Sequence, residues 1–164
     1  MNRHAVVLVL ALLAAVVAVE VAPASTKVAA CKTSDLVVWM DTNGDATAGS
    51  TYFKLKFTNQ SGHACTLTGY PGVSALDLHG NVLGSPASRD TSAVHVRHLA
   101  NGDTVSAVLR IVDALNFPAS SCVPRPAAGL RVFPPNQTTS KVVPLPFEAC
   151  AHSGSHVLSV RAVS

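Results

Sequence analysis

The clearest pattern in the chain is a strict alternation of apolar and polar side chains over residues 51–59. Phe53, Leu55 and Phe57 fall on one face of an extended segment, and tyrosine, lysine and threonine residues fall on the other. A period of two is typical of a β-strand with one face on a core and one face in water. We therefore expect an inner strand of a sheet here.

Residues 103–112 repeat this alternation and predict a second strand of the same kind. The Asn101-Gly102 pair just before it is a tight-turn signal, so residues 94–99 and 103–112 are expected to form a hairpin. Residues 73–78 and 82–83 flank a second turn signal and predict another hairpin. The chain therefore favours short antiparallel strands joined by turns.

Further short strands are expected at residues 36–40, 130–133, 141–145 and 157–163. Ten prolines argue against long helices, and only residues 112–116 suggest a turn of helix. Residues 42–50 are interpreted as a flexible loop. The predicted fold is all-β, an immunoglobulin-like antiparallel β-sandwich of about eight short strands. A closed barrel is the alternative that periodicity leaves open.

Two local interpretations concern side chains that could lie at the surface. Trp39 stands next to Met40 in the first predicted strand, and we expect it in the core rather than on a ligand platform. Residues 130–135 could present an apolar edge to a partner, but the Pro134-Pro135 pair favours an edge strand blunted by prolines.

The N-terminus differs from the rest of the chain. A short basic head at residues 1–4 precedes fifteen uncharged, almost wholly apolar residues, 5–19. Small residues around Ala24 follow, as a signal peptidase requires. We therefore predict a signal peptide at 1–24, with cleavage after Ala24, and a single domain at 25–164. This domain would be secreted or held at the cell surface.

Two other uses of the N-terminus stay open. An uncleaved membrane anchor would need about 20 consecutive apolar residues, and Glu20 and Pro23 interrupt the run, so no membrane span is expected after cleavage. Residues 28–31 match the box of bacterial lipoproteins, in which Cys31 would be lipidated. Charged residues and a proline separate this box from the apolar run, and lipidation would leave another cysteine without a partner.

All four cysteines lie beyond the predicted signal peptide: Cys31, Cys65, Cys122 and Cys150. An oxidising destination makes two disulfides the expected state, and four cysteines allow three connectivities. We favour Cys31 with Cys65 and Cys122 with Cys150, because each pair closes a local loop. Metal ligation is the competing interpretation, but the chain has no CxxC pair.

Charge excludes one class of partner. The formal net charge is +3, and it is unchanged when Arg3 and Glu20 are removed with the signal peptide. The basic residues are scattered from Lys27 to Arg161, with no run that would follow a phosphate backbone. A nucleic-acid partner is therefore not expected.

Histidines are the strongest candidates for chemistry, and they do not form a recognisable site. His95 and His98 would point to opposite faces of a regular strand, whereas His152 and His156 could converge in a loop. A metal normally needs three or four ligands, so we predict no metal and no cofactor. The chain also lacks GxSxG, HExxH and SxxK motifs and has a single glutamate, Glu148, beyond the signal. No catalytic residues are predicted.

Residues 57–72 carry a family resemblance. A strand ending in Thr58-Asn59, a loop leading to Cys65 and a Gly69-Tyr70-Pro71-Gly72 turn resemble the signature of exported actinobacterial domains of unknown function, numbered 4232. The resemblance extends from about residue 31 to 164 and implies secretion or surface attachment, a β-sandwich and disulfides within the domain. It implies no activity. We interpret the signature as architecture, with Asn59 and Ser61 capping the loop and Tyr70 as a possible contact residue.

The sequence thus favours an exported, non-catalytic β-sandwich that acts through its surface. The binding residues and the partner are unknown at this stage; a protein, a cell-envelope component or a small ligand would each fit. The alternatives are an envelope-tethered lipoprotein lipidated at Cys31 and a secreted hydrolase with an unrecognised site.

Overall fold

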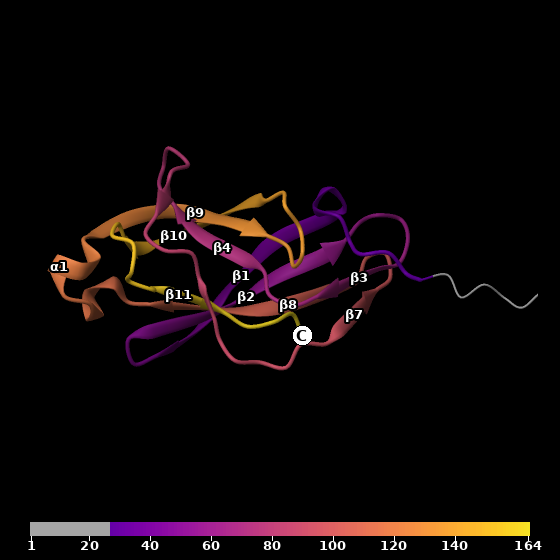
Figure 1. Ribbon diagram of the computed structural model, residues 1–164, viewed down its shortest axis with the longest axis horizontal. Helices are drawn as coiled ribbons and strands as arrows, with labels where there is room; N and C mark the ends of the chain where they lie inside the picture. The colour runs from indigo at the N-terminus through magenta and orange to yellow at the C-terminus, as the bar shows by residue number, and fades with distance from the viewer. Residues whose placement is uncertain (1–26) are drawn as a thin grey trace, which may run out of the picture.

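Two β-sheets facing each other dominate the structure (Figure 1). The computed structural model describes residues 27–164, so the predicted signal peptide lies outside the described residues. β9, β10 and β4 lie in one layer, and β2, β8 and β11 in the other (Figure 1). The predicted sandwich is therefore confirmed, with β11 and β6 as a parallel pair in an otherwise antiparallel arrangement.

The larger sheet has five strands in the order β1 (Leu36–Thr47), β2 (Ser50–Asn59), β8 (Thr104–Val112), β11 (Leu158–Val160) and β6 (Ser88–Arg89). The second has four strands in the order β10 (Lys141–Cys150), β9 (Pro124–Phe133), β4 (Gly72–Leu76) and β5 (Val82–Leu83). A separate pair joins β3 (Cys65–Thr68) and β7 (Val96–Leu99). Three short helical turns complete the fold: η1 (Thr33–Asp35), η2 (Ala114–Asn116) and α1 (Ala119–Cys122).

The core lies between the two large sheets. Leu55 and Phe57 of β2 and Leu109 of β8 are fully buried from one side, and Leu130 and Val132 of β9 are fully buried from the other. These side chains occupy the apolar positions of their strands. Burial of each one contributes roughly 1.5 to 3 kcal/mol of free energy to folding. The predicted inner strands 51–59 and 103–112 are thus confirmed as β2 and β8.

The hairpin predicted between residues 94–99 and 103–112 is wrong. β7 pairs with β3 instead, from Cys65↔Leu99 to Thr68↔Val96. β2 pairs along one side of β8, and β11 together with the following residues Arg161 and Ser164 forms backbone hydrogen bonds on the other, so that edge is taken by the C-terminal segment. The Asn101-Gly102 turn exists, and it passes the chain from one sheet to another rather than closing a hairpin.

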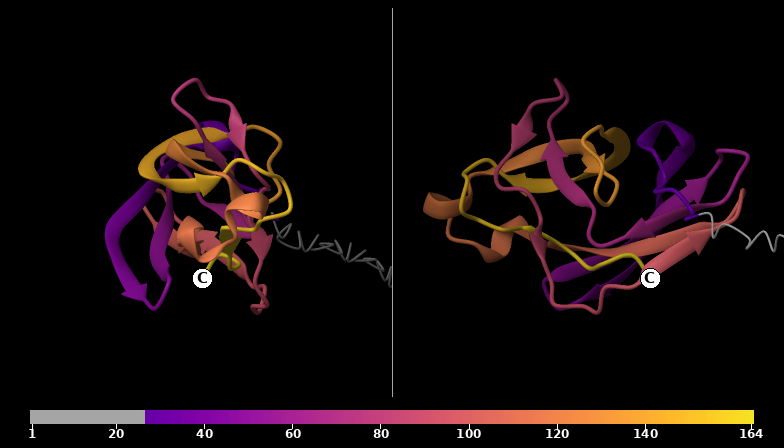
Figure 2. Two further views of the ribbon diagram at one scale, coloured as in Figure 1. Left: turned by 90° about the vertical axis from the view of Figure 1, so that its left-hand side faces the viewer. Right: turned by 45° about the vertical axis from the view of Figure 1, so that its right-hand side comes forward.

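The second predicted hairpin is confirmed, because β4 pairs with β5 through Ala75↔Leu83 and Leu76↔Val82. It projects from the four-stranded layer (Figures 1 and 2). The helical turn expected at 112–116 is also present as η2.

Residues 42–50 are not a flexible loop. They belong to a long hairpin in which β1 continues to Thr47, turns at Gly49 and returns in β2. Gly49 has a φ of 71°, which suits glycine at a tight turn. A bulge between Asp41 and Asp45 hides the alternation in the sequence.

The edge-strand interpretation of residues 130–135 is also wrong. β9 lies between β10 and β4, and the edge position belongs to β10. Pro144 and Pro146 lie in β10, where its register shifts. Proline has no backbone N–H to donate to a neighbouring strand, and an edge strand tolerates this loss because its outer side has no partner strand. Prolines do protect an edge of this sheet, but the edge strand that contains them is β10, the strand that follows β9 in the chain.

Both disulfides have the pairing favoured from the sequence. Cys31 is joined to Cys65, with their Cα atoms 4.9 Å apart, and Cys122 to Cys150, with theirs 4.6 Å apart. The first bond ties the N-terminal segment to β3, and the second ties α1 to the end of β10. A sulfur in a disulfide cannot also carry a lipid, so the structure does not support lipidation of Cys31. Within residues 27–164, no helix is long and apolar enough to cross a membrane.

Removal of either disulfide is expected to cost much of the domain's stability. The bonds span 34 and 28 residues of sequence, and the loop-entropy model assigns about 3 to 4 kcal/mol to each. The double variant Cys122→Ser/Cys150→Ser should lower the free energy of unfolding by that amount in a urea titration. A non-reducing peptide map of the wild type should show both bonds, and free thiols in a protein isolated without reductant would contradict this assignment.

Candidate functional site

The outer face of the five-stranded sheet carries the only tryptophan in the chain. Trp39 is 39% exposed on edge strand β1, directly opposite Lys56 of β2. The expectation that it lies in the core is wrong. Leu36 and Met40 are the buried residues of this strand, and Trp39 and Val37 point outward.

Two neighbours contact the indole of Trp39, and a third holds one of them in place. Its Nε1 donates a hydrogen bond to Thr58 Oγ1 at 3.1 Å, and the Nζ of Lys56 lies 4.5 Å from the ring centroid. Lys56 is itself fixed by Asp41, whose Oδ2 lies 2.9 Å from Nζ. A cation over an indole is an attractive arrangement, and here both partners are anchored to the same sheet. The ring is therefore presented to solvent in one orientation.

The charge of Asp41 belongs to this arrangement. A hydrogen bond from Lys56, followed by one from the backbone N–H of Asn43, holds the pKa of the Asp41 carboxyl below its usual range. The positive charge of Lys54 in the same strand lowers this pKa further. The carboxylate is thus ionised at neutral pH and keeps Lys56 beside the ring.

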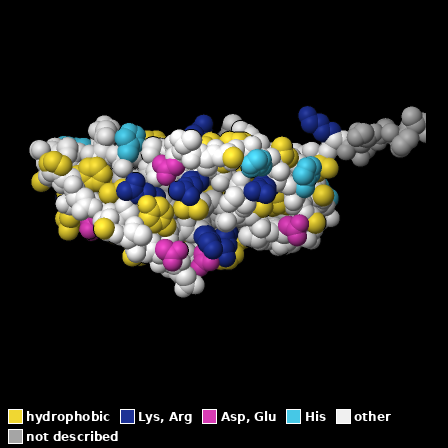
Figure 3. All heavy atoms as spheres, turned by 90° about the horizontal axis from the view of Figure 1, so that it is seen from below, with side chains coloured by type: hydrophobic (Ala, Val, Ile, Leu, Met, Phe, Trp, Pro, Cys, Tyr) yellow, Lys and Arg dark blue, Asp and Glu magenta, His cyan; other side chains and the backbone are white. Residues whose placement is uncertain are grey.

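A second aromatic and cationic pair lies further along the same face. The guanidinium of Arg110 lies 6.0 Å from the ring centroid of Tyr52, and its Nε donates to Ser50 Oγ at 3.0 Å. We call the outward side chains Val37, Trp39, Tyr52, Lys54, Lys56 and Arg110 the tryptophan face. Seen from below, the molecule shows Lys and Arg side chains lying among hydrophobic ones (Figure 3).

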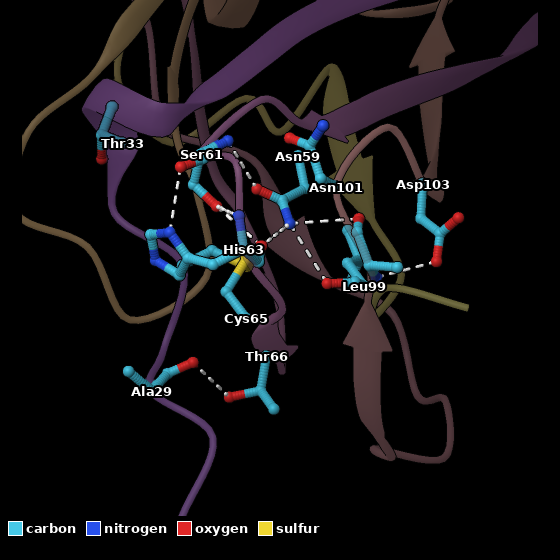
Figure 4. The surroundings of a disulfide bond; sticks show 12 residues. Ala29, Thr33, Asn59, Ser61, His63, Cys65, Thr66, Leu99, Asn101 and Asp103 are labelled. Carbon is cyan, nitrogen blue, oxygen red and sulfur yellow. Dashed lines mark hydrogen bonds between the residues drawn. A yellow bond between two sulfur atoms is a disulfide. The ribbon is translucent and has the colours of Figure 1, made fainter.

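The signature around residues 57–72 has a structural role, as predicted. Asn59 at the end of β2 is fully buried, and its Nδ2 donates to the carbonyl oxygens of His63, Leu99 and Ala100 (Figure 4). Its Oδ1 accepts from the backbone N–H of Ser61 at 3.0 Å. One amide side chain thus satisfies the buried carbonyl of Leu99 and two part-buried carbonyls, beside the disulfide at Cys65.

Tyr70 is anchored through its hydroxyl group. Its hydroxyl donates to the carbonyl oxygen of Ser92 at 3.0 Å and accepts from the N–H and Oγ of the same residue. The ring packs against the core, with the guanidinium of Arg89 5.5 Å from its centroid. Tyr70 therefore fastens the segment between β6 and β7 to the body of the domain.

The histidines do not converge on a site. His95, His98, His152 and His156 are all exposed. In the part of the chain that the structure describes, no three His, Cys, Asp or Glu side chains come close enough to hold a metal ion. Between residues 27 and 164, no serine hydroxyl is hydrogen-bonded to a histidine ring; Ser155 Oγ, for example, donates to the carbonyl oxygen of Ser121.

Comparison with known proteins places the chain in a family. The model described as Domain of unknown function (DUF4232) matches residues 31–164. The chain belongs to this family. Among curated proteins and among solved structures, no significant match was found. Membership confirms the resemblance inferred from the signature of this DUF4232 domain, and the family name specifies no activity.

Sequence reasoning missed the tryptophan face of this DUF4232 domain. Every residue from Leu36 to Met40 is apolar, so alternation could not show which of them point inward. The available signal was in β2, where Lys54 and Lys56 mark the outward positions and therefore the face of any partner strand.

Asn59 offers a test of the signature as architecture. Replacing it with Ala removes the amide donor of the buried Leu99 carbonyl and of two part-buried ones, and we expect a loss of about 3 kcal/mol in the free energy of unfolding. The matched control is Asn43→Ala, an exposed asparagine of β1, which should change stability by less than about 0.5 kcal/mol. Equal effects of the two substitutions in urea denaturation would show that the buried network is not what the signature provides.

The single tryptophan reports directly on Asp41. Because the pKa of Asp41 is lowered in the folded state, its stabilising contact with Lys56 is present at neutral pH and is lost as the pH falls through this lowered pKa. Trp39 fluorescence should therefore change with a midpoint below the ordinary aspartate value of about 3.9.

The fluorescence transition should disappear in Asp41→Asn. It should persist in Asp77→Asn, because the pKa of Asp77 is also lowered, by hydrogen bonds from Asn81, but in a different hairpin. Circular dichroism over the same range should show an intact fold. A transition retained in Asp41→Asn would contradict the assignment.

Proposed function

We propose that this protein is an exported, non-catalytic domain that binds a protein partner through its tryptophan face. Two disulfides fit an oxidising compartment, and the predicted signal peptide at 1–24 would deliver the chain there. The domain would then be secreted or remain at the cell surface. Its origin in an actinobacterium follows from the resemblance alone and is part of the proposal.

The observation that supports binding is the fixed, exposed indole of Trp39. Thr58 and Lys56 already restrict the ring, so a partner would lose little entropy by ordering it. Trp, Tyr and Arg dominate the energetics of protein interfaces, and this face presents one of each, namely Trp39, Tyr52 and Arg110.

The charges of the face favour a protein over a uniform polymer. Asp41, which pairs with Lys54 and contacts Lys56, places one carboxylate beside the three cations of the face, Lys54, Lys56 and Arg110. An anionic envelope polymer would be attracted by the three cations and would leave this carboxylate unmatched. A protein surface can match both signs, which gives specificity.

Site-specific photo-crosslinking of the mature protein in its native culture tests the proposal. A benzoylphenylalanine at Val37, which is 51% exposed beside Trp39, should yield one discrete cross-linked protein. Excess unlabelled wild type should abolish this product. Excess Trp39→Ala should compete at least about tenfold more weakly, as expected of a hot-spot tryptophan.

Val142 provides the matched control, since it is 66% exposed on β10 of the opposite sheet. The same product from a label at Val142, or equal competition by Trp39→Ala, would contradict binding through the tryptophan face. Labelling of envelope polysaccharide instead of protein would contradict the choice of partner. Turnover of a substrate by the purified domain, abolished by one histidine or aspartate substitution, would favour the hydrolase alternative.

A further inference from the structure

A cleft of about 310 Å³ opens beside the signature turn. We call it the signature cleft. Its walls come from three distant parts of the chain, namely the turn at residues 69–72, Arg89 of β6 and the segment from Phe133 to Gln137 that follows β9. The volume is at the lower end of the range for small-molecule sites.

Two aromatic rings and one guanidinium group lie at this cleft, lined by Tyr70, Phe133 and Arg89, whose guanidinium is 5.5 Å from the centroid of Tyr70. Arg131 does not line the cleft, but its guanidinium lies 5.8 Å from the centroid of Phe133. Each arginine is thus held over a ring rather than paired with a carboxylate. The ion pairs formed by residues 27–164 involve neither of these arginines.

The charge at the cleft is positive. Arg89 lines it, and no aspartate or glutamate does. The Nε of Arg131, behind Phe133, is buried and has no hydrogen-bond partner. Positive charge without a counterion, close to apolar walls, favours an anion over a neutral or cationic molecule.

Two residues that line the cleft, Asn136 and Gln137, are held in place by hydrogen bonds to other segments. Nδ2 of Asn136 donates to the carbonyl oxygen of Thr68 at 2.9 Å, and Oε1 of Gln137 accepts from the backbone N–H of Thr33. These bonds tie the turn after β9 to two other segments. Gly69 has no side chain and open space where a Cβ would stand, so a ligand can approach the backbone closely there.

We propose that the signature cleft binds a small organic anion, a carboxylate or phosphate carried on a planar apolar group. The planar part would lie against Tyr70 and Phe133, and the anionic part would receive hydrogen bonds from the guanidinium of Arg89. Arginine suits this task because its planar donors match both carboxylate and phosphate oxygens. The inference does not depend on the tryptophan face, since none of its residues lines the cleft.

Titration of the ¹⁵N-labelled mature protein with four probes tests the inference. Phenyl phosphate and benzoate should shift the amide signals of residues 69–72 and 133–137, with dissociation constants of about 1 mM or tighter. Inorganic phosphate, which has the charge without the ring, should bind at least about tenfold more weakly. Benzamidine, a cation of benzoate's shape, should cause no shifts there.

Variants separate the charge from the ring. Arg89→Gln should weaken phenyl phosphate at least about tenfold, because a charge-assisted hydrogen bond is lost. Phe133→Leu should weaken phenyl phosphate and leave the weak inorganic phosphate response unchanged. The matched control is Arg125→Gln, an exposed arginine at the far end of β9 that does not line the cleft, which should bind like the wild type.

Thermal unfolding of each variant establishes that the fold is intact before binding is compared. If Phe133→Leu does not fold, the binding of Arg89→Gln alone tests the inference. This variant is expected to fold because Arg89 is exposed and does not belong to the hydrophobic core. The inference is overturned if neither aryl anion shifts the cleft signals at about 10 mM. It is also overturned if benzamidine binds as well as benzoate, or if Arg89→Gln binds like the wild type.

Discussion

Burial of every second side chain between two facing sheets is the interaction on which this structure depends. Leu55 and Leu109 from one layer meet Leu130 and Val132 from the other, and all four are removed from water. A small domain gains only slightly more free energy from burial than it loses in chain entropy on folding, so such a core leaves a small net stability. The two disulfides increase this stability because they restrict the unfolded chain, one at each end of the fold.

The buried amide of Asn59 solves a problem that this layered arrangement creates. Where β2 ends, carbonyl oxygens of the loop before β3 and of the end of β7 come close to Asn59. Asn59 donates to three of these carbonyls, and the Cys31–Cys65 bond holds the same region together. A buried carbonyl without a donor would cost more than a hydrogen bond usually contributes. In this chain, the signature segment therefore lets β2 end without leaving nearby backbone groups unpaired.

A scaffold secured in this way can hold surface side chains in fixed positions. Trp39 is oriented by Thr58 and Lys56, and the rings of the signature cleft are each matched with an arginine. In both places cations are held over aromatic rings instead of being paired only with carboxylates. Preorganisation of this kind lowers the entropy cost of binding, and it links the rigidity of the fold to the two proposed surfaces.

The sequence by itself determined the inner strands β2 and β8, the class of fold and the role of Asn59, because alternation and turn residues are visible in local spacing. It favoured the two disulfide pairs among three connectivities, and the structure decided between them. Only the tertiary structure decided that β7 pairs with β3, that β1 runs on to Thr47 and that Trp39 faces outward. It also brought Arg89 and Phe133 together at one cleft. The physical reason is that a period of two shows which residues share a face, whereas the choice of partner strand depends on burial between segments distant in the chain.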